Sequence, residues 1–183
     1  MLFRSTVVYS SVTHPDGYRL RTIITEPSGS PRAKDGKLPA VLYVQGIVCD
    51  SIDRPGSPDA FDTRLVHAMA KAGFVTMRVD KPGLGDSEGP PCSEIDLTTE
   101  LEACKAALKQ LASLPSVDPN RIYLFGHSMG GVLAPYLSAD TPVRGSIVYG
   151  TIVRSWFEYQ LENARRQSEL AGLPPEEVTA RVQ

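Results

Sequence analysis

The chain has 183 residues, of which 42% are hydrophobic and 22% charged, and its formal net charge is −2. These values suit one globular domain with a real core, and they give no reason to expect a nucleic acid or an acidic membrane surface as a partner. The sequence contains no run of 18 apolar residues, and its start lacks the basic and then apolar layout of a signal peptide. We therefore expect a cytoplasmic protein without a membrane span.

Hydrophobic periodicity predicts six strands separated by helices. The predicted strands cover residues 6–13, 18–25, 40–44, 74–79, 121–126 and 143–149. The predicted helices cover residues 61–72, 96–113, 129–139 and 155–171, and a further helix starts at Pro175. The first two strands form a hairpin around Pro15-Asp16-Gly17, and afterwards strands and helices alternate. This order predicts an α/β fold: a mostly parallel sheet with helices on both faces.

Three cysteines, Cys49, Cys92 and Cys104, lie far apart in the chain. Their odd number and spacing argue against a disulfide framework and against a zinc site, so we expect reduced thiols. Cys104 falls on the apolar stripe of its helix and is expected in the core. Cys49 is a rival nucleophile, although a loop thiol packed as a small hydrophobe is the simpler interpretation. No metal-ligand cluster or cofactor motif is visible, so no metal and no cofactor are expected.

The residues Gly126-His127-Ser128-Met129-Gly130 spell G-x-S-x-G, which is the nucleophile elbow of serine hydrolases. A buried strand is predicted before this pentapeptide and a helix after it, as the elbow requires. The tight turn crowds the backbone on either side of the serine, and glycine relieves that crowding because it has no Cβ. Ser128 is therefore the candidate nucleophile.

The stretch 118–131 around this pentapeptide resembles the elbow of α/β-hydrolase fold enzymes. The similarity is closest to the branch that holds prolyl-oligopeptidase-like and dipeptidyl-peptidase-like hydrolases and esterases. Residues 78–89 resemble the loop after the family's fourth strand. Val44-Gln45-Gly46-Ile47 stands where the family has its oxyanion loop, usually His-Gly-x. Gln45 departs from that pattern, but the oxyanion donor is a backbone N–H, so the departure need not remove it.

The resemblance, which covers about residues 16–150, implies a serine hydrolase that cleaves an ester, thioester or peptide-like acyl bond. Ser128 Oγ would attack the acyl carbonyl. The backbone N–H of Met129 and, by resemblance, that of Ile47 would hold the oxyanion. A small-molecule or peptide acyl compound is then the expected substrate.

A serine nucleophile needs a histidine base, and the family supplies its acid and its histidine after the serine. The three histidines, His14, His67 and His127, all come before or beside Ser128. His14 and His67 are expected to be solvated. The side chain of His127 should diverge from that of its neighbour, so it is badly placed as the base.

By the same resemblance, residues 1–150 supply six of the family's eight strands, and residues 151–183 begin a helical cap. We therefore expect the N-terminal two-thirds of a hydrolase, inactive or nearly so as these 183 residues alone. The exposed edge of such a sheet makes self-association possible.

Three other interpretations stay open at this stage. The chain could be a non-catalytic binding or regulatory protein that keeps the fold, or an acyltransferase in which an alcohol or amine replaces water. The glycines of residues 83–89 partly match a dinucleotide-binding loop. The third glycine falls one place late and no helix follows at once, so this match is weak.

Overall fold

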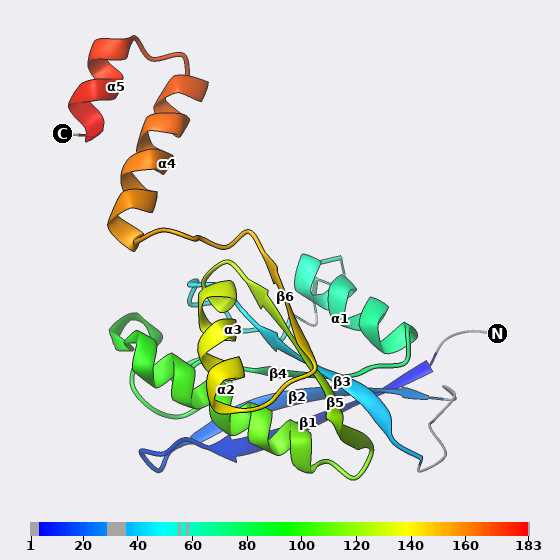
Figure 1. Cartoon of the computed structure of the whole chain (residues 1–183). Helices are drawn as coiled ribbons and strands as arrows, with labels where there is room; N and C mark the ends of the chain where they lie inside the picture. Colours follow the sequence, from blue (N-terminus) through cyan, green and yellow to red (C-terminus); the bar gives the residue numbers. More distant parts are fainter. Residues whose placement is uncertain (1–3, 29–35, 55, 58, 183) are drawn as a thin grey trace. The chain divides into compact units, whose positions relative to one another are not determined.

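The computed structural model describes residues 4–28, 36–54, 56–57 and 59–182 of the chain. It divides the chain into two compact units, Met1–Thr151 and Ile152–Gln183. The first unit is a six-stranded sheet with helices packed on it, and the second holds two helices (Figure 1).

The sheet of the first unit contains all six predicted strands in the order β1-β2-β4-β3-β5-β6. They are β1 (Arg4–Thr13), β2 (Arg19–Ser28), β3 (Leu38–Val44), β4 (Val75–Val79), β5 (Val117–His127) and β6 (Gly145–Tyr149). β1 and β2 form the predicted hairpin, and β2 pairs antiparallel with β4. β4, β3, β5 and β6 are parallel to one another, so the predicted mostly parallel sheet is confirmed.

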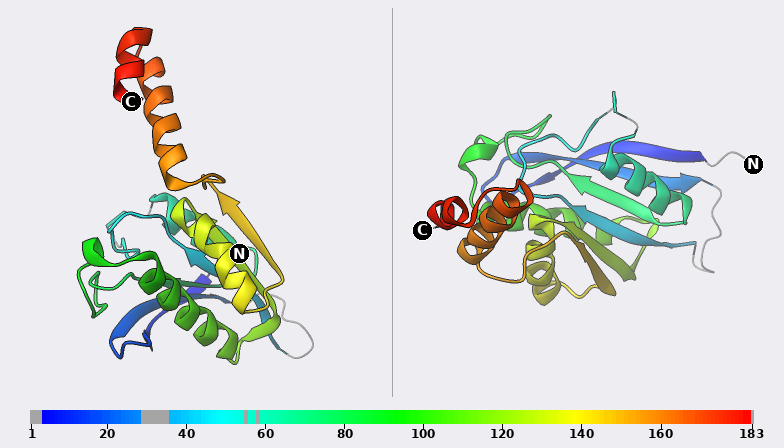
Figure 2. Two further views of the ribbon diagram at one scale, coloured as in Figure 1. Left: turned by 60° about the vertical axis from the view of Figure 1, so that its left-hand side comes forward. Right: turned by 90° about the horizontal axis from the view of Figure 1, so that it is seen from above.

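Helices cover both faces of this sheet (Figure 2). α2 (Leu97–Ser113) and α3 (Met129–Asp140) bury one face, where the main core gathers residues such as Leu42, Met77, Leu108, Leu124 and Leu137. α1 (Phe61–Lys71) packs on the other face, near a smaller cluster of Val41, Tyr43 and Phe125. In the part of the chain that the structure describes, every helix is too short or too polar to cross a bilayer.

The orientation of α1 differs from the expectation. The hydrophobic spacing of residues 61–72 predicts one apolar helix face that consists of Phe61, Leu65, Ala68, Met69 and Ala72. In the structure Phe61 is 52% exposed, whereas Val66 and Ala70, outside that set, are fully buried. Ala68, Met69 and Ala72 of that set border a pocket of about 500 Å³ on the sheet, which Val41, Phe74, Tyr123 and Ile147 also help to line.

β6 lies at one edge of the sheet and pairs with β5. Its residues Ile147, Val148 and Tyr149 are exposed by 57%, 46% and 59% in the structure. An exposed strand edge of this kind can pair with another chain, so the self-association predicted from the sequence stays a prediction.

The second unit consists of α4 (Trp156–Leu170) and α5 (Pro175–Val182). Ser155 caps α4: its hydroxyl accepts the N–H of Glu158, and the Glu158 carboxylate accepts the N–H of Ser155, which makes a capping box. Val178 of α5 and Ser168 of α4 are buried. That these helices begin a cap over a site stays a prediction.

A disulfide joins Cys49, in the loop after β3, to Cys92, in the loop after β4. The sequence-based expectation of reduced thiols and no disulfide was therefore wrong. The two residues are 43 positions apart in the chain, yet their Cα atoms are 5.7 Å apart. They meet because β3 and β4 are parallel neighbours, so the loops that follow them leave the same edge of the sheet. Cys104 is buried and free, as expected.

Replacing Cys49 and Cys92 together by serine should lower the free energy of unfolding by about 2–4 kcal/mol, because the unfolded chain loses a closed loop. Urea unfolding of the two proteins measures the difference. Thiol labelling supplies the control. Burial raises the pKa of the Cys104 thiol to about 12, so iodoacetamide should modify nothing in the native chain at pH 8 and one thiol in the unreduced, denatured chain. Three reactive thiols in the denatured chain would contradict the pairing.

Candidate active site

The carboxyl ends of β3, β5 and β6 bring three loops to one edge of the sheet. In the register of the sheet Val44 lies beside Gly126, and His127 lies beside Tyr149. The segment that begins at Gln45, the turn at Ser128 and the segment after Tyr149 are therefore neighbours. Ligand sites of open α/β sheets lie at such an edge, outside the carboxyl ends of the strands.

Ser128 stands between β5 and α3 with φ 54° and ψ −117°. Among the described residues it is the one non-glycine residue with a positive φ. Its N–H donates to the Tyr149 carbonyl at 2.9 Å, and its own carbonyl accepts the N–H of Gly131 at 2.9 Å. These bonds hold a backbone conformation that L-residues rarely adopt. The Ser128 side chain is partly exposed, and its hydroxyl has no hydrogen-bond partner in the described part of the chain.

Two glycines make this turn possible. A Cβ on Gly126 would overlap the carbonyl of Gly130, and a Cβ on Gly130 would overlap the carbonyl of Val44. Both overlaps are with backbone atoms, which cannot move aside as a flexible side chain can. β5, the turn and the end of β3 therefore approach as closely as they do because no side chain stands between them.

Both predicted oxyanion donors lie at this edge. Met129 is the first residue of α3, where a backbone N–H has no partner within the helix. Ile47 follows Gly46, and a Cβ on Gly46 would stand 3.2 Å from the Cβ of Ser128. The N–H groups of Ile47 and Met129 make no hydrogen bond within the described residues. Two backbone donors without partners among the described residues thus lie at the sheet edge that carries Ser128.

No histidine is hydrogen-bonded to the Ser128 hydroxyl among the described residues. The ring of His127 packs beside the turn instead, with its centroid 5.8 Å from that of Phe61 and 5.7 Å from that of Tyr149. His67 is exposed, as expected.

His14 was expected to be solvated, and this was wrong, because its side chain is 2% exposed. The ring stacks on Tyr18 at a centroid distance of 4.4 Å. Its Nδ1 accepts the N–H of Asp16, and its Nε2 lies 3.2 Å from the Thr99 carbonyl. The turn therefore packs against the start of α2 instead of projecting into solvent.

The loop 83–89 is fastened to β2 by its polar groups. The Ser87 hydroxyl accepts the backbone N–H of Arg21 at 2.9 Å, and the Glu88 carboxylate accepts that of Arg19 at 2.9 Å. Arg21 Nε donates to Asp80, at the start of the same connection, at 2.7 Å. These polar groups bind protein, so the weak nucleotide-binding interpretation gains nothing from them.

A buried ion pair that sequence reasoning missed lies beside the loop that follows β3. Lys81 Nζ is 3.0 Å from Glu100 Oε1, and the two side chains are 4% and 10% exposed. Burial raises the pKa of Glu100, and the ammonium of Lys81 opposes that shift. One signal was present in the sequence. Glu100 stands four residues before Cys104, on the apolar stripe of its helix, where a lone carboxylate needs a partner.

The model of the alpha/beta hydrolase family matches residues 51–182, which is more than half of the chain. This chain belongs to the alpha/beta hydrolase family. The match confirms the resemblance to α/β-hydrolase fold enzymes seen in the sequence.

This chain is also similar to parts of individual known proteins. A stretch of 47 residues is 47% identical to the quorum-quenching protein AidA of Acinetobacter baumannii and covers 26% of this chain and 16% of that protein. A stretch of 100 residues is 34% identical to the polyketide transferase ATR5 of Stachybotrys chlorohalonatus and covers 50% of this chain and 33% of that protein. An esterase structure from Pyrococcus furiosus superposes with a TM-score of 0.66 at 17% identity, over 95% of this chain and 58% of that one, which shows the fold.

Replacing Gly126 by alanine should destabilise the chain by about 1–3 kcal/mol, because the added methyl group overlaps a backbone carbonyl. Gly145→Ala is the matched control in the neighbouring strand. There the new Cβ would meet the Tyr123 ring at 3.6 Å, which is an ordinary contact. The control should stay within about 0.5 kcal/mol of the original chain. Equal losses in urea unfolding for the two variants would contradict the close approach at the turn.

Proposed function

We propose that this chain carries the nucleophile and the oxyanion hole of a serine hydrolase that acts on an ester, thioester or peptide-like acyl bond. The observation that carries the proposal is the backbone of Ser128. A positive φ is costly for serine, and such strain persists where the surroundings impose it, often at functional sites. Here it presents an unpaired hydroxyl next to two unpaired N–H groups at the carboxyl edge of the sheet.

The proposed reaction follows from these positions. Ser128 Oγ attacks the acyl carbonyl, and the carbonyl oxygen becomes an oxyanion that accepts the N–H groups of Met129 and Ile47. Each such donor contributes roughly 3 kcal/mol to the stability of the transition state. The leaving group departs as the acyl-enzyme forms, and water then releases the acyl group and restores the serine.

The same reaction requires a base for the proton of Ser128. Within the described residues no side chain accepts that proton through a hydrogen bond, and His127 is held by its aromatic neighbours. Loss of the histidine from a serine–histidine unit lowers turnover by about a million-fold. We therefore propose that these 183 residues alone are nearly inactive, with only the contribution of the oxyanion hole, roughly a thousand-fold over water, left in place.

Acyl transfer is the second candidate, and the similarity to a polyketide transferase favours it. An alcohol or amine would then take the place of water in the second step. Both candidates use the same serine and the same oxyanion donors, so they share the first half of the reaction. The partner that accepts the acyl group is what separates them.

Covalent labelling tests the nucleophile. Incubated with a fluorophosphonate, the chain should gain one phosphonyl group on Ser128: the P–O bond forms, the P–F bond breaks and HF leaves. Intact-protein mass spectrometry followed by peptide mapping measures the adduct. The reaction should be slow, since no base assists it, and Ser128→Ala should abolish it.

His127→Ala is the control for the base, and it should be labelled at the rate of the unchanged chain, because His127 does not accept the serine proton. An adduct that persists in Ser128→Ala, or none on Ser128 after prolonged incubation, would contradict the proposal. Either result would favour a non-catalytic protein that keeps the fold.

A further inference from the structure

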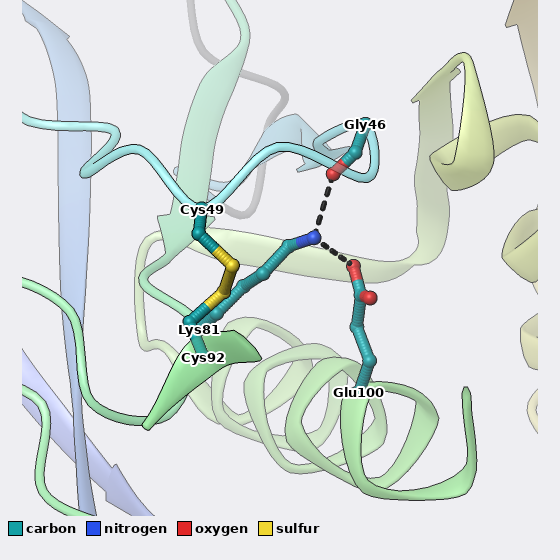
Figure 3. The surroundings of a disulfide bond; sticks show 5 residues. All are labelled: Gly46, Cys49, Lys81, Cys92 and Glu100. Carbon is teal, nitrogen blue, oxygen red and sulfur yellow. Dashed lines mark hydrogen bonds and ion pairs between the residues drawn. A yellow bond between two sulfur atoms is a disulfide. The ribbon is translucent and has the colours of Figure 1, made fainter. Parts of the chain in front are cut away.

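Lys81 joins the oxyanion loop to α2. Its Nζ donates to the Gly46 carbonyl at 2.7 Å and pairs with Glu100 at 3.0 Å (Figure 3). Lys81 lies just after β4, whereas Gly46 lies just after β3, so the side chain bridges two loops of the same sheet edge. At 4% exposure, the ammonium group is almost fully removed from water.

The carbonyl that Lys81 binds belongs to the peptide between Gly46 and Ile47. No peptide bond in the described chain is cis, and in a planar trans peptide the C=O and the following N–H point in opposite directions. A bond that holds the Gly46 oxygen toward Lys81 therefore turns the Ile47 N–H away from Lys81. The orientation of the proposed oxyanion donor is thus fixed through its own peptide plane.

Other contacts hold the rest of this loop but leave that peptide alone. The disulfide fastens Cys49 to Cys92, as Figure 3 shows beside Lys81. The N–H of Ile52 donates to Asp80 at 2.9 Å, and Arg78 donates to the Ile52 carbonyl at 3.0 Å. Among the described residues, Lys81 makes the one hydrogen bond to the Gly46 carbonyl.

We propose that Lys81 is a positioning residue for the oxyanion hole, with Glu100 as its counter-ion; this rests on the proposed function. A buried ion pair is weak evidence for stability, because desolvation of both charges offsets their attraction. The pair matters here because it sets the direction of a hydrogen bond to the loop. Lys81 supplies a donor at one fixed place beneath the loop, and Glu100 lets that donor stay charged while buried.

The test removes both charges together, so that neither is left buried without a partner. Lys81→Met/Glu100→Leu keeps similar side-chain volumes and deletes the bond to Gly46. The probe reaction is hydrolysis of p-nitrophenyl acetate by the full 183-residue chain, whose residual rate depends on the oxyanion hole because no base assists Ser128. The control is Lys105→Met/Glu102→Leu, which removes a lysine–glutamate pair within α2, 2.9 Å apart, without touching the oxyanion loop. The carboxylate of Asp140, a second partner of Lys105, is exposed and stays in water.

We expect kcat of the Lys81 double variant to fall roughly ten- to a hundred-fold while KM stays unchanged. The misplaced donor no longer stabilises the oxyanion of the transition state, and it does not contribute to substrate binding. The control variant should keep both constants. Glu100→Gln, which leaves Lys81 able to reach Gly46, should lose less than the double variant. Thermal melting should show that the compared proteins are folded at the assay temperature.

The unchanged chain and the folded double variant could both exceed the buffer rate and show equal rates. This result would overturn the role of Lys81 and leave the proposed function intact. A raised KM with kcat unchanged would overturn that role as well. Failure of the proposed function appears differently: the unchanged chain would neither exceed the buffer rate nor label at Ser128. If the Met/Leu variant does not fold, Lys81→Gln/Glu100→Gln, in which two amides replace the charges, carries the same comparison.

Discussion

The turn from β5 into α3 is the constraint on which the rest of the site depends. It brings the backbone of Gly126, Gly130 and Val44 so close that a single methyl group would overlap a carbonyl. At this turn Ser128 has a positive φ, and its N–H donates to the Tyr149 carbonyl at 2.9 Å. The shape of the turn thus presents the hydroxyl and leaves the N–H of Met129, the first residue of α3, without a partner among the described residues.

The parallel order of the strands supplies the other half of the site. Because β3 lies between β4 and β5, the loop after β3 meets the serine on one side and the β4–α2 connection on the other. That connection contributes Asp80, Lys81 and Cys92, and each of them holds a different point of the loop after β3. One loop therefore carries the proposed donor, and its neighbour fixes where that donor lies.

The sequence was sufficient for the features that depend on local pattern. Hydrophobic periodicity and turn residues predicted the six strands, the helices between them and the strand–turn–helix at Ser128. Features that depend on distant parts of the chain were missed. The Cys49–Cys92 pair, the buried His14 and the Lys81–Glu100 pair each join segments brought together by the sheet, which spacing along the chain does not encode. β5 starts at Val117 and not at residue 121, because the Asp118-Pro119-Asn120 turn signal lies within an irregular part of the β3–β5 ladder.

The most direct measurement of the central claim is a crystal structure of the chain after reaction with a fluorophosphonate. We predict phosphorus bonded to Ser128 Oγ and a phosphonyl oxygen that accepts the N–H groups of Ile47 and Met129, each at about 2.7–3.1 Å. Lys81 should still bind the Gly46 carbonyl in that structure. A phosphonyl oxygen directed into solvent, with both N–H groups left unpaired, would contradict an oxyanion hole at this turn.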